Sequence, residues 1–210
     1  LVSNSWAGGQ GDTYVKPTVD TWRAAGIIPI FGIGNSGPKC STANSPGDLP
    51  NVIGVGATNS ADSLSSFSSK GPAVIGLMKP DISAPGEDVQ SAAITGANDF
   101  VSMSGTSMAT PHISGVVALM LSVRPGMTYD EVKALLSSTA ERNSLAKIGY
   151  ACGGVPETVF PNNQYGSGRA NALAAVNKLI AAMDRCSGLS ELICGELLCQ
   201  WSNGVCSSWL

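Results

Sequence analysis

The chain has 210 residues, of which 43% are hydrophobic and 13% charged, and its formal net charge at pH 7 is −3. This composition supports a globular core and excludes an intrinsically disordered chain. The chain is slightly acidic, so it lacks the basic surface that binding to nucleic acid or to an anionic membrane would require. The longest apolar run, residues 113–123, is shorter than the about 20 residues of a membrane span. We therefore expect no nucleic-acid partner and no membrane span.

The first quarter of the chain is expected to form strands and a helix. Residues 1–6 resemble the end of a buried strand, and residues 16–25 predict a helix that Gly26 ends. The continuous apolar runs at residues 27–31 and 51–57 are typical of strands buried on both faces. Together they predict a three-layer α/β fold, with a mostly parallel sheet and helices on both faces.

The remainder of the domain adds one extended segment and three helices. Residues 79–86 predict a turn-rich extended segment. Residues 106–123 are apolar nearly all round, which indicates a central buried helix. A capping-box pattern opens a predicted helix over residues 128–139, and apolar residues at helical spacing predict another over residues 171–183.

The composition changes after residue 183, where Cys, Gly and Ser become frequent. We therefore divide the chain into a domain of residues 1–183 and a Cys-rich tail of residues 184–210. The cysteines include no C-x-x-C pair of the kind that binds zinc, so disulfides in an oxidising, extracellular compartment are expected. The clustering of Cys186, Cys194, Cys199 and Cys206 favours local bridges in the tail, and we assign no pairs. The tail is interpreted as a disulfide-bonded cap or as the start of an accessory domain.

Residues 32–37 match the G-x-G-x-x-G pattern of dinucleotide-binding loops and follow a predicted strand. A dinucleotide site also requires a helix to begin at this loop, whereas no helical pattern occurs before Pro50. We therefore interpret these residues as a Gly-rich turn.

Ser107 is the candidate nucleophile. It lies at the mouth of the predicted buried helix, after Gly105, which lets the chain turn, and Thr106, which can cap the helix. There the helix dipole and free N–H groups favour developing negative charge, as attack on an acyl carbon requires. A serine in this position is more often only an N-cap, and Ala109 excludes the G-x-S-x-G elbow of α/β-hydrolases.

Residues 105–112, Gly-Thr-Ser-Met-Ala-Thr-Pro-His, closely resemble the block around the nucleophile of subtilisin-like serine proteases, the subtilases or peptidase S8 family. Four further segments resemble the family in the same order, at residues 5–8, 34–37, 67–72 and 81–86. The resemblance runs from Leu1 to about Ala182. It implies the C-terminal part of a subtilisin-like catalytic domain, incomplete at its N-terminus. The implied activity is that of a serine endopeptidase acting through an acyl-enzyme.

The resemblance assigns roles to several residues. Ser107 is expected to be the acylated nucleophile, with the Asn35 amide and the Ser107 N–H forming the oxyanion hole. The edge expected to pair with the substrate backbone consists of Ser5, Trp6 and Ala7. The wall of the adjacent specificity pocket is expected to contain Phe31, Gly32 and Ile33. Ala7 and Trp6 depart from the Gly and Leu that are common in the family, which leaves the subsite preference open.

His112 is the only histidine, and the resemblance implies a structural role for it, pointing away from Ser107. In the family the triad Asp and His precede the nucleophile, so both are expected upstream of residue 1. Residues 1–210 by themselves are therefore expected to be nearly inactive and poorly stable. The alternative is a catalytically inactive, subtilase-like binding or scaffold domain.

The expected chemistry requires no cofactor. Calcium commonly stabilises this family, but Asp48, Asp62 and Asp81 suggest no ligand cluster, so we place no metal. Proteins or peptides are the expected substrates, and a prodomain or a protein inhibitor could also bind.

Overall fold

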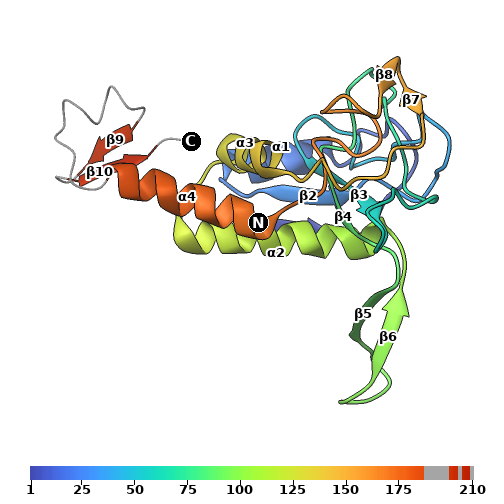
Figure 1. Cartoon of the computed structure of the whole chain (residues 1–210), viewed down its shortest axis with the longest axis horizontal. Helices are drawn as coiled ribbons and strands as arrows, with labels where there is room; N and C mark the ends of the chain where they lie inside the picture. Colours follow the sequence, from blue (N-terminus) through green and yellow to red (C-terminus); the bar gives the residue numbers. More distant parts are fainter. Residues whose placement is uncertain (187–198, 203–204, 209–210) are drawn as a thin grey trace.

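The computed structural model describes the backbone of residues 1–186, 199–202 and 205–208, and the side chains of residues 1–183. Its centre is a parallel sheet of four strands in the order β1-β2-β3-β4 (Figure 1). The strands are β1 (Val2–Asn4), β2 (Pro29–Gly32), β3 (Ile53–Thr58) and β4 (Ile82–Pro85). Every residue of β2 and β3 is buried, which explains why their sequences are almost continuously apolar.

Helices cover both faces of this sheet (Figure 1). They are α1 (Lys16–Ala24), α2 (Thr106–Val123), α3 (Tyr129–Thr139) and α4 (Ala172–Cys186). The long helix α2 packs against all four strands and against α4, whereas α1 and α3 lie on the opposite side of the sheet. The predicted three-layer α/β fold is therefore confirmed.

The main core lies between the sheet and α2. Ile53 and Val55 of β3 and Ile82 of β4 meet Ile113 and Val117 of α2, and all five side chains are almost completely buried. The predicted helix boundaries agree with the structure within a few residues, because this apolar surface and the local helix signals point to the same segments.

The start of α3 shows how a local signal fixes a helix end. Thr128 Oγ1 accepts the Glu131 N–H, and the Glu131 carboxylate accepts the Thr128 N–H at 2.7 Å, which completes the predicted capping box. The start of α2 differs from the prediction. Its N-cap is Gly105, and Thr106 is the first helical residue and caps nothing with its own side chain.

Two further features differ from the sequence-based prediction. The extended segment at residues 79–86 contains β4, a full member of the parallel sheet. A hairpin of β5 (Val89–Ala92) and β6 (Phe100–Met103) projects away from the body of the molecule and was not predicted (Figure 1). Its residues are mostly exposed and follow no clean alternation of polar and apolar side chains, so no strand pattern marks it in the sequence.

Two short antiparallel pairs complete the described elements. They are β7 (Ala151–Cys152) with β8 (Val155–Pro156), and β9 (Cys199–Ser202) with β10 (Val205–Ser208). Helix α4 continues past the predicted boundary at residue 184. The side chains of the Cys-rich tail, and therefore the bridges predicted within it, lie outside the described residues.

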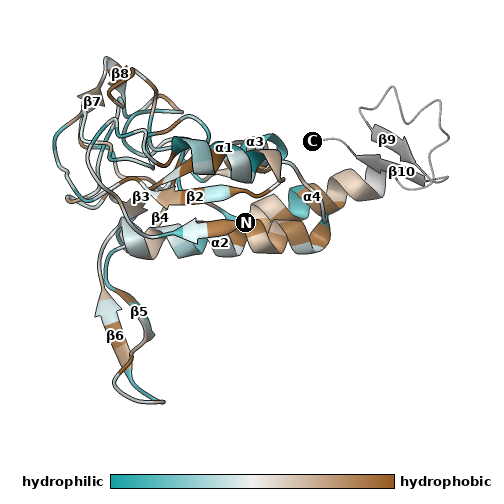
Figure 2. Cartoon of the chain, turned by 180° about the vertical axis from the view of Figure 1, so that it is seen from behind, coloured by the Kyte–Doolittle hydropathy of each residue, from teal (hydrophilic) through white to brown (hydrophobic). Residues whose placement is uncertain are grey.

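By length and composition, α2 could cross a membrane. In the structure its inner face packs on the sheet, and Ile113, Val117 and Met120 are fully buried. Figure 2 shows apolar residues along both α2 and α4, where the two helices contact each other.

A buried group of charges joins the amino ends of β3 and β4 to α3. Asp81 contacts the ammonium groups of Lys79 and Lys133, each at 2.6 Å, and accepts the Gly54 N–H at 2.7 Å. Burial raises the pKa of the Asp81 carboxyl, but the two lysine charges outweigh burial and hold this pKa below its usual value. Lys79 is itself 2% exposed, so Asp81 neutralises a charge that water cannot reach.

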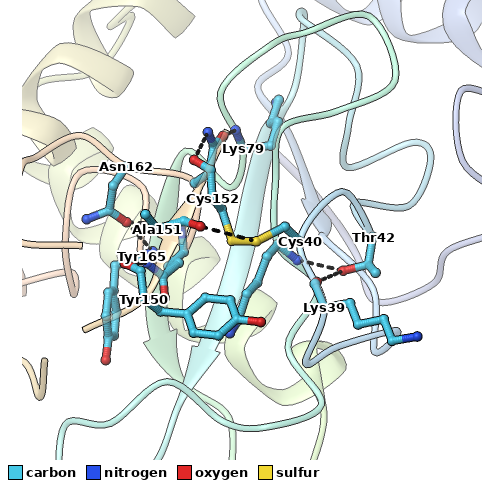
Figure 3. Close-up of a disulfide and its surroundings, with 12 residues drawn as sticks. Lys39, Cys40, Thr42, Lys79, Tyr150, Ala151, Cys152, Asn162 and Tyr165 are labelled. Atoms are coloured by element: carbon cyan, nitrogen blue, oxygen red, sulfur yellow. Dashed lines mark hydrogen bonds between the residues drawn. A yellow bond between two sulfur atoms is a disulfide. The ribbon is translucent and has the colours of Figure 1, made fainter. Parts of the chain in front are cut away.

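One disulfide joins Cys40, in the long loop between β2 and β3, to Cys152 of β7 (Figure 3). The two cysteines are 112 residues apart, and Cys152 is fully buried. The Asn163 side chain donates to the Cys152 carbonyl at 3.1 Å and fixes that end of the bridge. The bridge therefore ties the loop that carries Asn35 to a distant part of the chain.

Candidate active site

The site forms where β1, β2 and α2 meet. In a parallel sheet the carboxyl ends of the strands share one edge, where ligands bind in open α/β folds. Residues 5–8 follow the end of β1, and residues 34–36 follow the end of β2. The amino end of α2 lies at the same place, because Ser107 bonds to Ser5 and Thr106 bonds to Asn35. Three segments that are distant in sequence thus converge on one cavity.

Ser107 is the second residue of α2. At that position its backbone N–H has no partner within the helix. Its hydroxyl donates to the Ser5 carbonyl at 3.0 Å, and the Ser5 hydroxyl donates to the Ser107 carbonyl at 2.8 Å. This reciprocal pair of bonds fixes the segment after β1 against the start of α2.

Asn35 is exposed, yet one end of its amide is held firmly. Its Oδ1 accepts the Thr106 N–H at 2.9 Å and the Thr106 hydroxyl at 3.0 Å. Asn35 thereby supplies the capping oxygen that α2 lacks, and the Nδ2 donor at the other end stays clear of this contact. A Cβ at Gly105 would lie 3.3 Å from Nδ2, so the glycine leaves room beside that donor.

Both Ser107 and Asn35 line one cavity of about 230 Å³. Of the predicted substrate-binding residues, four also line it: Ser5, Trp6, Ala7 and Gly32. The residues that sequence reasoning did not assign there are Gly8, Gly34, Ser36, Asn44 and Thr106. Gly34 and Ser36 are the sequence neighbours of Asn35, so the assignment of Asn35 to the site could have indicated both of them. Nothing in the sequence indicates Asn44, which reaches the cavity from a distant part of the loop.

Phe31 and Ile33 are fully buried and do not line the cavity. Phe31 instead packs against Trp6, which does line the cavity. Its ring meets the Trp6 ring edge-on, with the centroids 5.3 Å apart, and it stacks on Trp22 of α1. The half-exposed Trp6 is thus held in position by an aromatic contact across β1 and β2.

A second cavity of about 360 Å³ lies on the other side of Ser107, between α2 and β5. His112 and Ser107 both line it, and the direction of the His112 side chain relative to Ser107 stays a prediction. Its Nδ1 lies 2.8 Å from the Met108 carbonyl, within its own helix. Among the described residues, no imidazole or carboxylate contacts the Ser107 hydroxyl, whose partner is the Ser5 carbonyl.

Asp48, Asp62 and Asp81, at which we placed no metal, all contact other groups of the chain. Asp48 accepts the Ser45 hydroxyl and the Gly11 N–H, Asp62 pairs with Arg169, and Asp81 pairs with lysines. Within the described part of the chain, no three His, Cys, Asp or Glu side chains gather where they could hold a metal ion.

Comparison with known proteins places this chain in a family. The family model described as "Subtilase family" matches residues 1–168. Bacillopeptidase F of Bacillus subtilis (strain 168) is 37% identical over 194 residues, covering 90% of this chain and 13% of that protein. Serine protease AprX of the same strain is 41% identical over 63% of this chain and 34% of its own length. Subtilisin of Bacillus pumilus is 39% identical over 67% of this chain and 49% of its own length.

The chain belongs to the subtilase family. It spans between about one eighth and one half of the length of these curated relatives.

Proposed function

We propose that this chain is part of a serine endopeptidase that hydrolyses peptide bonds through an acyl-enzyme. The observation that carries this proposal is the placing of the Ser107 hydroxyl and the Asn35 amide on one cavity, at the amino end of α2. The relatives that are named subtilisins and serine proteases support the same activity.

In the proposed reaction, the Ser107 Oγ attacks the carbonyl carbon of the scissile peptide bond and forms a tetrahedral intermediate. The Ser107 N–H and the Asn35 Nδ2 donate hydrogen bonds to its oxyanion. The segment at residues 5–7 binds the backbone of the substrate. Collapse of the intermediate releases the amine and leaves Ser107 acylated, and water then hydrolyses the ester. No step requires a cofactor.

The proton of Ser107 must pass to a general base before the amine can leave. His112 is held by its own helix and does not contact Ser107, so we assign the base to a histidine outside residues 1–210, oriented by an aspartate. The cavity between α2 and β5 adjoins Ser107 and is open to such a residue. Residues 1–210 alone should then hydrolyse peptides about 10⁶-fold more slowly, the loss that follows removal of the base from subtilisin itself.

The test is to label the full-length protein that contains this chain with a fluorophosphonate and to map the adduct. We expect the adduct on Ser107, and we expect Ser107→Ala to abolish both labelling and peptide hydrolysis. Ser122→Ala is the matched control, because Ser122 lies on the same helix and its hydroxyl bonds only to the Leu119 carbonyl. Hydrolysis that persists in Ser107→Ala would overturn the proposal.

The alternative is a catalytically inactive domain that binds proteins without cleaving them. It predicts a folded full-length protein that binds peptides but is neither labelled at Ser107 nor able to hydrolyse any substrate. The disulfide between Cys40 and Cys152 supports an extracellular location for either version. A prodomain or protein inhibitor would bind the same edge at residues 5–7, as a substrate strand does.

A further inference from the structure

A cavity of about 170 Å³ lies apart from the candidate active site. It is enclosed by three loops, which connect β2 to β3, β3 to β4, and α3 to α4. Its lining includes Pro38, Leu64, Lys70, Ala146, Glu157 and Gln164. None of the residues around it lines the cavity that contains Ser107 and Asn35, so this is a separate place on the molecule.

The Glu157 carboxylate is buried at this cavity with one oxygen unpaired. The residue is 2% exposed. Its Oε1 accepts the Gly149 N–H, whereas its Oε2 has no hydrogen-bond partner among the described residues. Its backbone is fixed, because its N–H donates to the Tyr150 carbonyl at 3.1 Å and its carbonyl accepts the Asn162 side chain at 3.0 Å. A buried oxygen without a donor is unfavourable, so a ligand that donates to Oε2 would stabilise it.

Lys70 brings a positive charge to the same cavity. The residue is 5% exposed, and its ammonium group lies 4.6 Å from the centroid of the Tyr150 ring. No ion pair within the described part of the chain includes Lys70 or Glu157. Burial lowers the pKa of Lys70, and the charge of Glu157 opposes this shift. The two opposite charges therefore line one cavity and act on each other without forming an ion pair.

These two charges define the chemistry of a ligand. Lys70 would repel a lone cation, and Glu157 would repel a lone anion. A molecule with both an ammonium and a carboxylate group would form a charge-assisted hydrogen bond with each of them. The apolar side chains of Leu64 and Ala146 suit a short aliphatic group. At about 30 Å³ for each water molecule, the cavity has room for about five or six, close to the number of non-hydrogen atoms in alanine.

We propose that this cavity binds a small free amino acid, with its ammonium group on Glu157 Oε2 and its carboxylate on the Lys70 ammonium group. Its side chain would lie against Leu64 and Ala146. The ligand supplies the donor that Glu157 lacks and a counter-charge for Lys70, so both charges stay buried with partners. This inference does not depend on the proposed peptidase function.

The test measures binding to the full-length protein by isothermal titration calorimetry. The probes are alanine, ethylamine and propionate, because ethylamine lacks the carboxylate of alanine and propionate lacks its ammonium group. For the natural sequence we expect alanine to bind about tenfold more tightly, or better, than either of the other probes. The reason is that each single-charge probe leaves one buried charge without a partner.

Two substitutions remove the charges one at a time. Glu157→Gln keeps an oxygen for the Gly149 N–H, and Lys70→Met keeps an unbranched apolar chain. Each should weaken the binding of alanine about tenfold or more. The order of the probes should also invert, so that propionate binds to Glu157→Gln more tightly than alanine does, and ethylamine to Lys70→Met. A general loosening of the fold would weaken all probes and would not produce this inversion.

Glu87→Gln and Lys147→Met are the matched controls. Both positions lie outside the cavity, and Lys147 is exposed and adjoins the lining residue Ala146 in sequence. Alanine should bind to both controls as it binds to the natural sequence. Circular dichroism shows whether each variant is folded. If one of the two cavity variants does not fold, the other variant and the probe series on the natural sequence still test the inference.

The outcomes that would overturn the inference are distinct. If the natural full-length protein does not bind alanine, the cavity holds only water. If alanine and ethylamine bind equally, Lys70 does not recognise a carboxylate. If alanine binds unchanged to both Glu157→Gln and Lys70→Met, the amino acid binds elsewhere. None of these results bears on the peptidase function, which is tested at Ser107.

Discussion

Asn35 caps α2 with one end of its amide, and we propose that the other end donates to the oxyanion. Its oxygen caps α2 through the Thr106 N–H and hydroxyl, and Asn35 also lines the cavity. Because the oxygen is already bonded, the amide cannot rotate freely, and the Nδ2 donor keeps its direction before substrate arrives. Such preorganised donors stabilise an oxyanion without reorganisation during the reaction.

The two tasks can be separated by substitution in the full-length protein. Asn35→Asp keeps an oxygen for Thr106 but removes the donor, so kcat should fall about 10²–10³-fold, the magnitude known from subtilisin itself. The free energy of unfolding, from urea titration, should stay close to that of the natural sequence. Asn35→Ala should lose the same activity and also about 0.5–2 kcal/mol of stability, because the cap is gone. A wild-type kcat in Asn35→Asp would contradict the role in the oxyanion hole.

At the scale of elements, the site depends on loops rather than on helices and strands. The segment between β2 and β3 contains Asn35 and Asn44 and has no helix or strand of its own. Two contacts hold this segment in place. The Asn44 side chain donates to the Gly8 carbonyl, and a disulfide joins Cys40 to Cys152 (Figure 3). Long loops are the mobile parts of most folds, so a loop that must place a donor accurately needs such ties.

Replacing both Cys40 and Cys152 by Ser should lower the free energy of unfolding by about 2–5 kcal/mol. The reason is that the unfolded chain gains much conformational entropy when a bridge across 112 residues is removed. The Asn35 loop should also loosen, so kcat should fall more than KM rises. The Asn143→Gly variant, an exposed loop substitution outside the bridge, serves as the control. Thermal unfolding and steady-state kinetics measure the two effects. Unchanged stability in the double variant would show that the bridge does not constrain this part of the chain.

At the scale of the whole molecule, stability and chemistry are placed at opposite ends of the sheet. The candidate active site lies at the carboxyl ends of β1 and β2. The ion group around Asp81 lies at the amino ends of β3 and β4, where it ties the sheet to α3 through Lys133. We therefore expect substitutions in the ion group to change stability and leave the active-site geometry intact.

The pKa of Asp81 is lowered in the folded state, so its charge stabilises the fold above the unfolded pKa of about 3.9. This stabilisation is lost as the pH falls below that value and through the folded pKa. Asp81→Asn should lower the free energy of unfolding at pH 7 by about 3–5 kcal/mol, because Lys79 stays buried without its partner. It should also flatten the fall in stability below pH 4, as measured by urea unfolding across pH.

The partly exposed pair of Asp62 and Arg169 is the control for Asp81. Its side chains are 23% and 30% exposed, so Asp62→Asn should cost only about 0–1 kcal/mol. An equal cost for Asp62→Asn and Asp81→Asn would contradict a special role for the buried group.

The sequence by itself determined the features that depend on near neighbours. Residues close together in sequence specify the capping box at Thr128, the apolar runs of β2 and β3 and the helical stretch of α2. The block around Ser107 likewise identified the family. Local backbone preference and burial favour the same structure in these segments, which is why the sequence predicts them correctly.

Only the tertiary structure decided the contacts between distant segments. Asn35 caps a helix that begins 71 residues later, Asn44 bonds to Gly8 of the segment after β1, and Cys40 pairs with a cysteine 112 residues away. The hairpin of β5 and β6 is set by pairing across exposed residues rather than by a buried pattern. Such contacts depend on how the sheet and α2 bring chain segments together, and no local spacing encodes that arrangement.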